Sequence, residues 1–160
     1  MIFTAQRKFK GFTLIELLIV IAIIGILAAA VLIAINPTKR QNQAKDSNIK
    51  SDIASISTAL QAYYTSPGLP NSFSGTYPKD LVTLQTNNDL KSIPVPPGGG
   101  TYSYVKNPLA CDPTLAVPVA CTDVAVYGTM TEDSTKVWCW QSSTGKASSV
   151  ALAPLACTAP

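Results

Sequence analysis

The sequence predicts an α+β protein, in which a long N-terminal helical spine, transmembrane in its first half, carries a small antiparallel β-sheet domain packed on its C-terminal half. Three observations support this fold class. An apolar block fills residues 12–35, an amphipathic repeat continues to about residue 65, and strand-like runs alternate with turns in the last third of the chain. We therefore expect a basic leader over 1–11, a helix over 12–65 and one small globular head over 66–160.

The formal net charge of +3 originates in the first ten residues. Arg7, Lys8 and Lys10 supply it, and beyond residue 11 nine basic side chains balance nine acidic ones. A neutral body is a poor match for general nucleic-acid binding, so nucleic acid is not indicated as a partner. The chain also lacks histidine, which excludes Ser-His-Asp and Cys-His catalysis and histidine zinc ligands.

The apolar block at 12–35 is long enough to span a membrane as a helix. Of its 24 residues 21 are hydrophobic, and Leu17 to Ile35 contains no polar side chain. Such a helix reaches roughly 36 Å at about 1.5 Å per residue, which exceeds the hydrocarbon core of a bilayer. An ordinary secretory signal peptide is the alternative, although its apolar region usually spans only about 7–15 residues.

Glu16 is the unusual residue of this block. A carboxylate inside a lipid-embedded helix costs about 2.5–3.5 kcal/mol on insertion scales, so it is expected to be paired and functional. The structural alternative is that its side chain extends to the cytoplasmic interface and has no further role.

The run Lys-Gly-Phe-Thr-Leu-Ile-Glu-Leu-Leu-Ile-Val at 10–20 resembles the type III signal sequence of type IV pilins and type II secretion pseudopilins. That motif joins a basic leader, a glycine, a phenylalanine and a glutamate four residues further on in an apolar helix. The resemblance implies that prepilin peptidase cuts between Gly11 and Phe12 on the cytoplasmic side and then N-methylates Phe12. The new Phe12 amine would lie at the membrane depth of Glu16, where the two charges of neighbouring subunits form a suitable pair for assembly.

Later segments resemble the spine and first loop of major pseudopilins more loosely: Ala34 to Pro37, Ala44 to Asp46, Ile49 to Tyr64 and Tyr77-Pro78. The family implies a structural subunit, not an enzyme, that polymerises into a helical filament. Its partners would be other copies of the chain, prepilin peptidase and an inner-membrane assembly platform driven by a cytoplasmic ATPase. Before assembly the subunit would cross the inner membrane once, and the filament would lie in the periplasm or on the cell surface.

Two questions stay open at the level of sequence. The residues do not choose between a pilus, a secretion pseudopilus and a DNA-uptake pilus, or between a major and a minor subunit. The rival from another functional class is a secreted or membrane-anchored, disulfide-stabilised binding domain behind an ordinary signal peptide.

A helix break is predicted at Asn36-Pro37, where the chain leaves the membrane. Proline lacks an N–H and disfavours helical geometry at Asn36, while Asn36 could equally cap a second helix that begins at Pro37. Glycine costs about 1 kcal/mol and proline about 3 kcal/mol inside a helix, so we expect local weakness between Gly25 and Pro37. In filaments of the family, part of this stretch is often extended.

Beyond the break, apolar residues recur at three- and four-residue steps up to about residue 65. This repeat predicts one amphipathic helix whose stripe packs under the head. The stripe consists of Ile49, Ile53, Ile56, Leu60 and Tyr63 or Tyr64. The opposite, solvated face carries Lys45, Asp46, Lys50, Asp52 and Gln61.

The head is predicted to hold one short helix and four strands. A Gly/Pro/Ser loop at 67–78 precedes a helix over Lys79 to Thr86 with Leu81, Val82 and Leu84 inward. The strand candidates are 101–105, 124–130, 135–141 and the weaker 146–152. Trp138 and Trp140 share one strand face, which we expect to be buried and not an exposed binding patch. The triple glycine at 98–100 is no phosphate cradle, because neither a lysine nor a helix start follows it.

Four cysteines, all beyond residue 110, indicate an oxidising compartment and therefore a head outside the cytoplasm. The numbers of basic residues on the two sides of the apolar block are nearly equal, so they do not decide its orientation in the membrane. No C-x-x-C pair is present, so a zinc site is not expected. Among the three pairings we favour Cys111–Cys121 and Cys139–Cys157, each worth about 2–4 kcal/mol.

No cofactor or catalytic residue is indicated. Major pseudopilins often bind calcium in a loop of the sheet, and calcium is the only metal that the resemblance raises. The acidic residues of the corresponding half are Asp112, Asp123, Glu132 and Asp133, without a D-x-D-x-D pattern. We therefore assign no metal site, and nothing pairs a nucleophile with a base.

Overall fold

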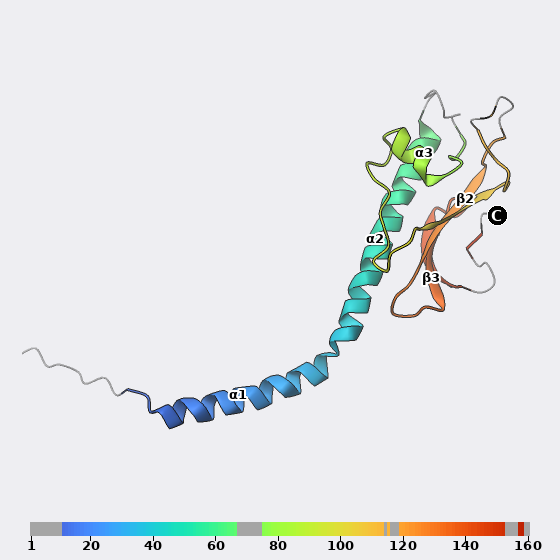
Figure 1. The fold of residues 1–160 in the computed structure, drawn as a ribbon. Helices are drawn as coiled ribbons and strands as arrows, with labels where there is room; N and C mark the ends of the chain where they lie inside the picture. The colour runs from blue at the N-terminus through green and yellow to red at the C-terminus, as the bar shows by residue number, and fades with distance from the viewer. Residues whose placement is uncertain (1–10, 67–74, 114, 116–118, 153–156, 159–160) are drawn as a thin grey trace, which may run out of the picture. The chain divides into compact units, whose positions relative to one another are not determined.

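The computed structural model describes residues 11–66, 75–113, 115, 119–152 and 157–158. The basic leader at 1–10 and most of the loop predicted at 67–78 lie outside these residues. The chain divides near residue 40 into two compact units. The described elements follow in the order α1 (Leu14–Ile35), α2 (Pro37–Thr65), α3 (Leu81–Thr86), β1 (Ser103–Asn107), β2 (Asp123–Thr129), β3 (Lys136–Gln141) and β4 (Lys146–Ala151) (Figure 1).

One residue, Asn36, separates the two long helices. It adopts a left-handed conformation with φ of 47° and ends α1, a conformation that asparagine tolerates better than most residues. Its side-chain Oδ1 also accepts a hydrogen bond from Lys39 N at 3.3 Å, which caps the start of α2, and Pro37 takes the first helical position that suits proline. α1 continues without interruption through Gly25. Any weakening of this stretch in an assembled filament stays a prediction.

α2 buries one face along its length in the head. Its buried residues are Asp46, Ile49, Ile53, Ile56, Ser57, Ala59, Leu60 and Tyr63. The predicted apolar stripe is therefore confirmed, and Tyr63 rather than Tyr64 completes it. Tyr64 is half-exposed and packs on the ring of Tyr77, with the ring centroids 4.8 Å apart.

The four strands form one antiparallel sheet in the order β1-β2-β3-β4, so each strand pairs with its neighbour in sequence. Every strand begins and ends within two residues of its predicted segment, and the α+β class is confirmed. Trp140 and the partly buried Trp138 belong to the same core cluster as the isoleucines of α2, so the tryptophan face of β3 is the buried one. Val137 and Cys139 pack on the opposite face with Cys157.

The short helix α3 begins two residues later than predicted. Asp80 is its N-cap, and its Oδ1 accepts a hydrogen bond from Thr83 N at 2.8 Å. Leu81 and Leu84 are buried as expected, but Val82 is 59% exposed. The prediction that Val82 points inward is wrong, because one helical turn places only every third or fourth residue against the core.

Two disulfides join Cys111 to Cys121 and Cys139 to Cys157, the pairing that the sequence spacing favours. The first closes a short loop ahead of β2, and Cys121 also forms an isolated antiparallel bridge with Tyr77. The second fastens the C-terminal segment to β3, where Gln141 Nε2 donates to the Thr158 carbonyl at 2.9 Å. The C-terminal segment is thus held against the sheet by a covalent bond and a hydrogen bond.

Candidate functional site

The start of α1 is closed by a reciprocal cap between Thr13 and Glu16. Thr13 Oγ1 accepts a hydrogen bond from Glu16 N at 3.3 Å, and Glu16 Oε2 accepts from both Thr13 N and Thr13 Oγ1 at 2.8 Å. This capping box satisfies donors that the first turn of any helix leaves without partners. The T-x-x-E spacing of residues 13–16 is the sequence signal for this capping box. The assembly hypothesis for Glu16 did not predict its role as a cap.

Glu16 is the only charged residue of α1. A negative side chain in the first turn interacts favourably with the helix dipole. Among the described residues only its Oε2 atom has hydrogen-bond donors, and no donor reaches Oε1. The carboxylate therefore caps its own helix and retains an oxygen that can accept from a cation outside the chain.

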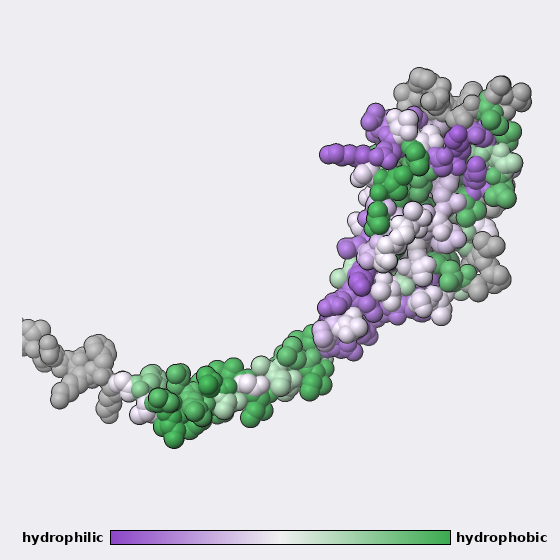
Figure 2. All heavy atoms as spheres, in the orientation of Figure 1, coloured by the Kyte–Doolittle hydropathy of each residue, from purple (hydrophilic) through white to green (hydrophobic). Residues whose placement is uncertain are grey.

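The remaining surface of α1 is apolar on all sides. In the described part of the chain, α1 is the one helix long and apolar enough to cross a membrane, with mean hydropathy 3.3, and none of its residues is buried. Figure 2 shows this helix as an almost uniformly hydrophobic segment. Each Å² of such surface costs about 25 cal/mol in water, so lipid or other helices must cover it.

Gly11 and Phe12 precede the helix in exposed, non-helical chain. Phe12 is 89% exposed, and a Cβ built on Gly11 would meet no atom within 4 Å. The peptide bond between them is therefore open to an enzyme. Cleavage at this bond and methylation of Phe12 stay predictions, and the basic leader lies outside the described residues.

Asp46 corrects the sequence assignment of α2. It was expected on the solvated face with Lys45, but it is only 4% exposed. Its Oδ1 accepts from Thr131 N at 2.5 Å and its Oδ2 accepts from Glu132 N at 3.1 Å, so the carboxylate ties α2 to the β2–β3 turn. Hydrophobic periodicity missed this contact, because a buried carboxylate that is fully hydrogen-bonded has no apolar signature.

Two further residues of the expected solvated face also contact the sheet. Asp52 accepts a hydrogen bond from the Tyr102 hydroxyl at 2.6 Å, and the Lys50 ammonium lies 4.8 Å from the ring centroid of Trp138. Burial, followed by the hydrogen bond and the charge of Asp52, raises the pKa of Tyr102. The polar residues of α2 thus anchor the sheet beside the apolar stripe.

The acidic residues considered for calcium do not form a common site. Asp112 pairs with Lys79 at 3.5 Å, and Asp123 accepts from Ser142 Oγ at 3.3 Å. Asp133 accepts from Thr135 and pairs with Lys136 at 3.0 Å, and these contacts, the Thr135 hydroxyl first, lower the pKa of Asp133 to about 2. Within the described ranges no three acidic or cysteine side chains converge as metal ligands.

Comparison with known proteins points to the same segment. The family model described as "prokaryotic N-terminal methylation motif" matches residues 6–32. Type II secretion system core protein G of Pseudomonas aeruginosa is 35% identical over 109 residues, which cover 62% of this chain and 75% of that protein. Its Escherichia coli namesake is 32% identical over 110 residues, covering 63% and 74% respectively. The type IV major pilin protein PilA of Myxococcus xanthus is 49% identical over 57 residues, covering 35% and 24%. No solved structure matches the chain.

The stretch matched by the family model contains the cap and most of α1, the helix in which no residue is buried. The chain is thus of the class of proteins that join an N-terminal methylation motif and a long apolar helix to an α+β head. More narrowly, it belongs to the family of type II secretion pseudopilins and type IV pilins. The resemblance found in the sequence is confirmed.

Proposed function

We propose that this protein is a structural subunit that polymerises into a helical, type IV pilus-like filament. The observation that carries the proposal is the combination of an uncovered apolar helix with one carboxylate, Glu16, close to its start. A solitary protein gains only a helix cap from Glu16, and the carboxylate is otherwise unfavourable in lipid. A bundle of such helices covers the apolar surface and also supplies partners for the charge.

Cleavage of the leader would create the positively charged partner of Glu16. Cleavage between Gly11 and Phe12 removes the leader and leaves a cationic amine on Phe12, one turn before Glu16. The peptidase then methylates this amine. In a filament the amine of one subunit reaches Glu16 of the next, where Oε1 is still available. Two opposite charges about 4 Å apart are worth about 4 kcal/mol at an effective dielectric of about 20. Pairing therefore offsets the cost of two charges in lipid together.

This function assigns a role to each region of the chain. Residues 1–11 would be the cytoplasmic leader, 12–65 the spine with its spanning part at 12–35, and 66–160 the disulfide-containing head outside the cytoplasm. Subunits would wait in the inner membrane until an assembly platform with a cytoplasmic ATPase moves them into the filament. We further propose that the helix between Gly25 and Pro37 loosens in the filament, and a filament map with continuous straight helix from Phe12 to Tyr64 would refute this.

The test is the intact mass of the membrane-derived protein, combined with imaging of filaments released by shear. The proposed function predicts a chain that spans residues 12–160 with one methyl group, and filaments that contain it. An N-terminus beyond Ala30 would contradict the proposal and support the rival, a secreted binding domain behind an ordinary signal peptide. A correctly processed chain that never forms filaments would also contradict it.

A further inference from the structure

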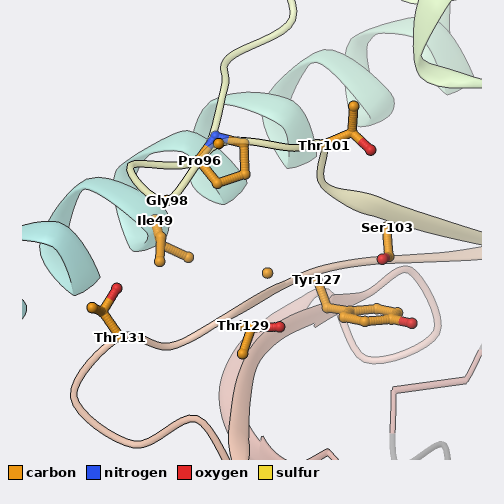
Figure 3. A pocket seen from close by; sticks show the side chains of 10 residues that line it. Ile49, Pro96, Gly98, Thr101, Ser103, Tyr127, Thr129 and Thr131 are labelled. Carbon is orange, nitrogen blue, oxygen red and sulfur yellow. The ribbon is translucent and has the colours of Figure 1, made fainter.

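The head contains a pocket of about 180 Å³ that the filament function does not use (Figure 3). It lies where the loop before β1 crosses α2, beside the ends of β1 and β2. Ile49 of α2, Pro96 of the loop and Tyr127 of β2 supply its apolar lining. Glycines 98, 99 and 128 also line it, and the remaining lining residues carry aliphatic hydroxyls: Thr101, Ser103, Thr129 and Thr131. We call this site the hydroxyl pocket.

The hydroxyl side chains of the pocket lie at the solvent-exposed or half-buried surface of the head. Among the described residues, the four pocket hydroxyls neither donate nor accept a hydrogen bond within the protein. Exposed hydroxyls such as those of Ser134 and Ser148 share this property in the described part of the chain. Several hydroxyls of α2 instead donate to carbonyls of their own helix at 2.8–3.0 Å: those of Ser47, Ser55, Ser57, Thr58 and Thr65. The pocket therefore gathers hydroxyls that remain free to donate to and accept from a ligand.

The walls of the pocket are fixed before any ligand enters. Thr131 is held through its backbone N–H by the buried Asp46 carboxylate at 2.5 Å. Gly99 N donates to the Pro96 carbonyl at 2.8 Å, and the positive φ of 80° at Gly99 needs a glycine. Glycines 98 and 99 also place no side chain in the mouth. A fixed wall lowers the entropy that a ligand must lose on binding.

The lining residues favour a neutral ligand over a charged one. None of them carries a charge. The adjacent Asp46 has both oxygens occupied by the backbone N–H groups of Thr131 and Glu132. A charged ligand would therefore find no counter-charge among the lining residues. The lining therefore suits a neutral ligand with several hydroxyl groups and an apolar face for Ile49, Pro96 and Tyr127.

The size of the pocket restricts the ligand further. Its 180 Å³ is below the roughly 300–1,000 Å³ of sites for drug-sized molecules. It corresponds to about six waters at about 30 Å³ each. This is room for one ring, with any further part of the ligand outside. We propose that the hydroxyl pocket binds a single neutral sugar ring, either free or at the end of a glycan.

The test is an NMR titration of the ¹⁵N-labelled full chain in detergent micelles. The probes are the methyl glycosides of glucose, galactose, mannose and N-acetylglucosamine, with glucuronate as the charged comparison. At least one neutral glycoside should cause saturable shifts confined to the amides around Gly98, Gly99, Thr129 and Thr131, with affinity on the order of millimolar for so few contacts. Glucuronate should bind more weakly, because its carboxylate finds no cation.

The matched variant replaces Thr101, Thr129 and Thr131 by valine, which keeps their shape and removes three hydroxyls. These hydroxyls have no partner among the described residues, and valine has nearly the shape of threonine, so the fold should persist and the amide spectrum will show it. Loss of the hydrogen bonds should weaken binding by about tenfold or more. Thr58→Val, outside the pocket, should bind as the unmodified chain. Absence of saturable shifts with all four glycosides, shifts elsewhere in the head, equal binding of glucuronate or unchanged affinity in the triple variant would overturn the proposal.

Discussion

α1 and α2 follow each other with one residue between them, yet they depend on different surroundings. α1 has 22 residues and buries none of them, whereas α2 has 29 and buries eight against the head. The stability of α2 therefore comes from the chain's own sheet, while α1 must obtain its environment from lipid or from other copies. Fold and assembly are thus separated along one polypeptide.

The largest expected effect sets a buried isoleucine of α2 against an exposed one of α1. Ile53 is fully buried and Ile24 is 58% exposed. Ile53→Ala should lower the free energy of unfolding of the head by about 2–5 kcal/mol, because it removes contacts and leaves a cavity. Ile24→Ala should leave it unchanged. Denaturant unfolding of the full chain in detergent, followed by fluorescence of Trp138 and Trp140, measures both. Equal losses would mean that the two helices are not independent.

The second largest effect concerns Asp46, a buried polar residue of α2. Asp46→Ala leaves the N–H groups of Thr131 and Glu132 without their acceptor. Each hydrogen bond to a charged group is worth about 1.5–3 kcal/mol, but water can replace part of this at the partly exposed turn, so the variant should cost about 2–3 kcal/mol. The control is Lys45→Ala, one residue earlier and exposed, which should change stability by less than about 0.5 kcal/mol. The same unfolding assay compares them, and similar losses would remove the assigned role of Asp46.

The smallest effect concerns the hydrogen bond from Tyr102, the residue before β1, to Asp52 of α2. Tyr102→Phe should cost about 1 kcal/mol at neutral pH. Burial and Asp52 raise the pKa of Tyr102, so the folded state favours the neutral hydroxyl. Its contribution is complete below the usual tyrosine pKa of about 10 and is lost as pH rises beyond it.

The free energy of unfolding, measured as a function of pH above about 10, tests whether the contribution of Tyr102 to stability falls with rising pH. Tyr102→Phe should reduce the downward slope without abolishing it, because burial also raises the pKa of Tyr63, Tyr77 and Tyr104. A slope that is identical in the variant and the unmodified chain would contradict the assignment to Tyr102.

The elements that the sequence predicted best depend on local pattern. The apolar block, the isoleucine stripe of α2 and the alternation around Trp138 and Trp140 each repeat with the period of their element, so the fold class followed. Asp46 was misplaced because its partners lie 85 and 86 residues away, and no local pattern announces them. The hydroxyl pocket has the same origin, since it exists only where a glycine loop meets α2 and two strand ends.

The candidate assembly site at Glu16 was also predictable only as far as local sequence patterns determine it. Glu16 stood out because one carboxylate interrupts an apolar block, and the cap with Thr13 was readable from the T-x-x-E spacing. What the neighbour contributes is not visible in one chain, because the Phe12 amine that would meet Glu16 belongs to another copy.

Filament yield from Glu16→Gln, at equal subunit levels, tests the role of α1 most directly. Glutamine at this position also completes a capping box, so the variant keeps the helix start and removes only the charge. The leader is unchanged, so the chain should still be cut after Gly11 and accumulate in the membrane. We expect few or no filaments by imaging of sheared material, with the intact mass of the processed chain as the control. A normal yield of filaments would show that the carboxylate is not required for assembly.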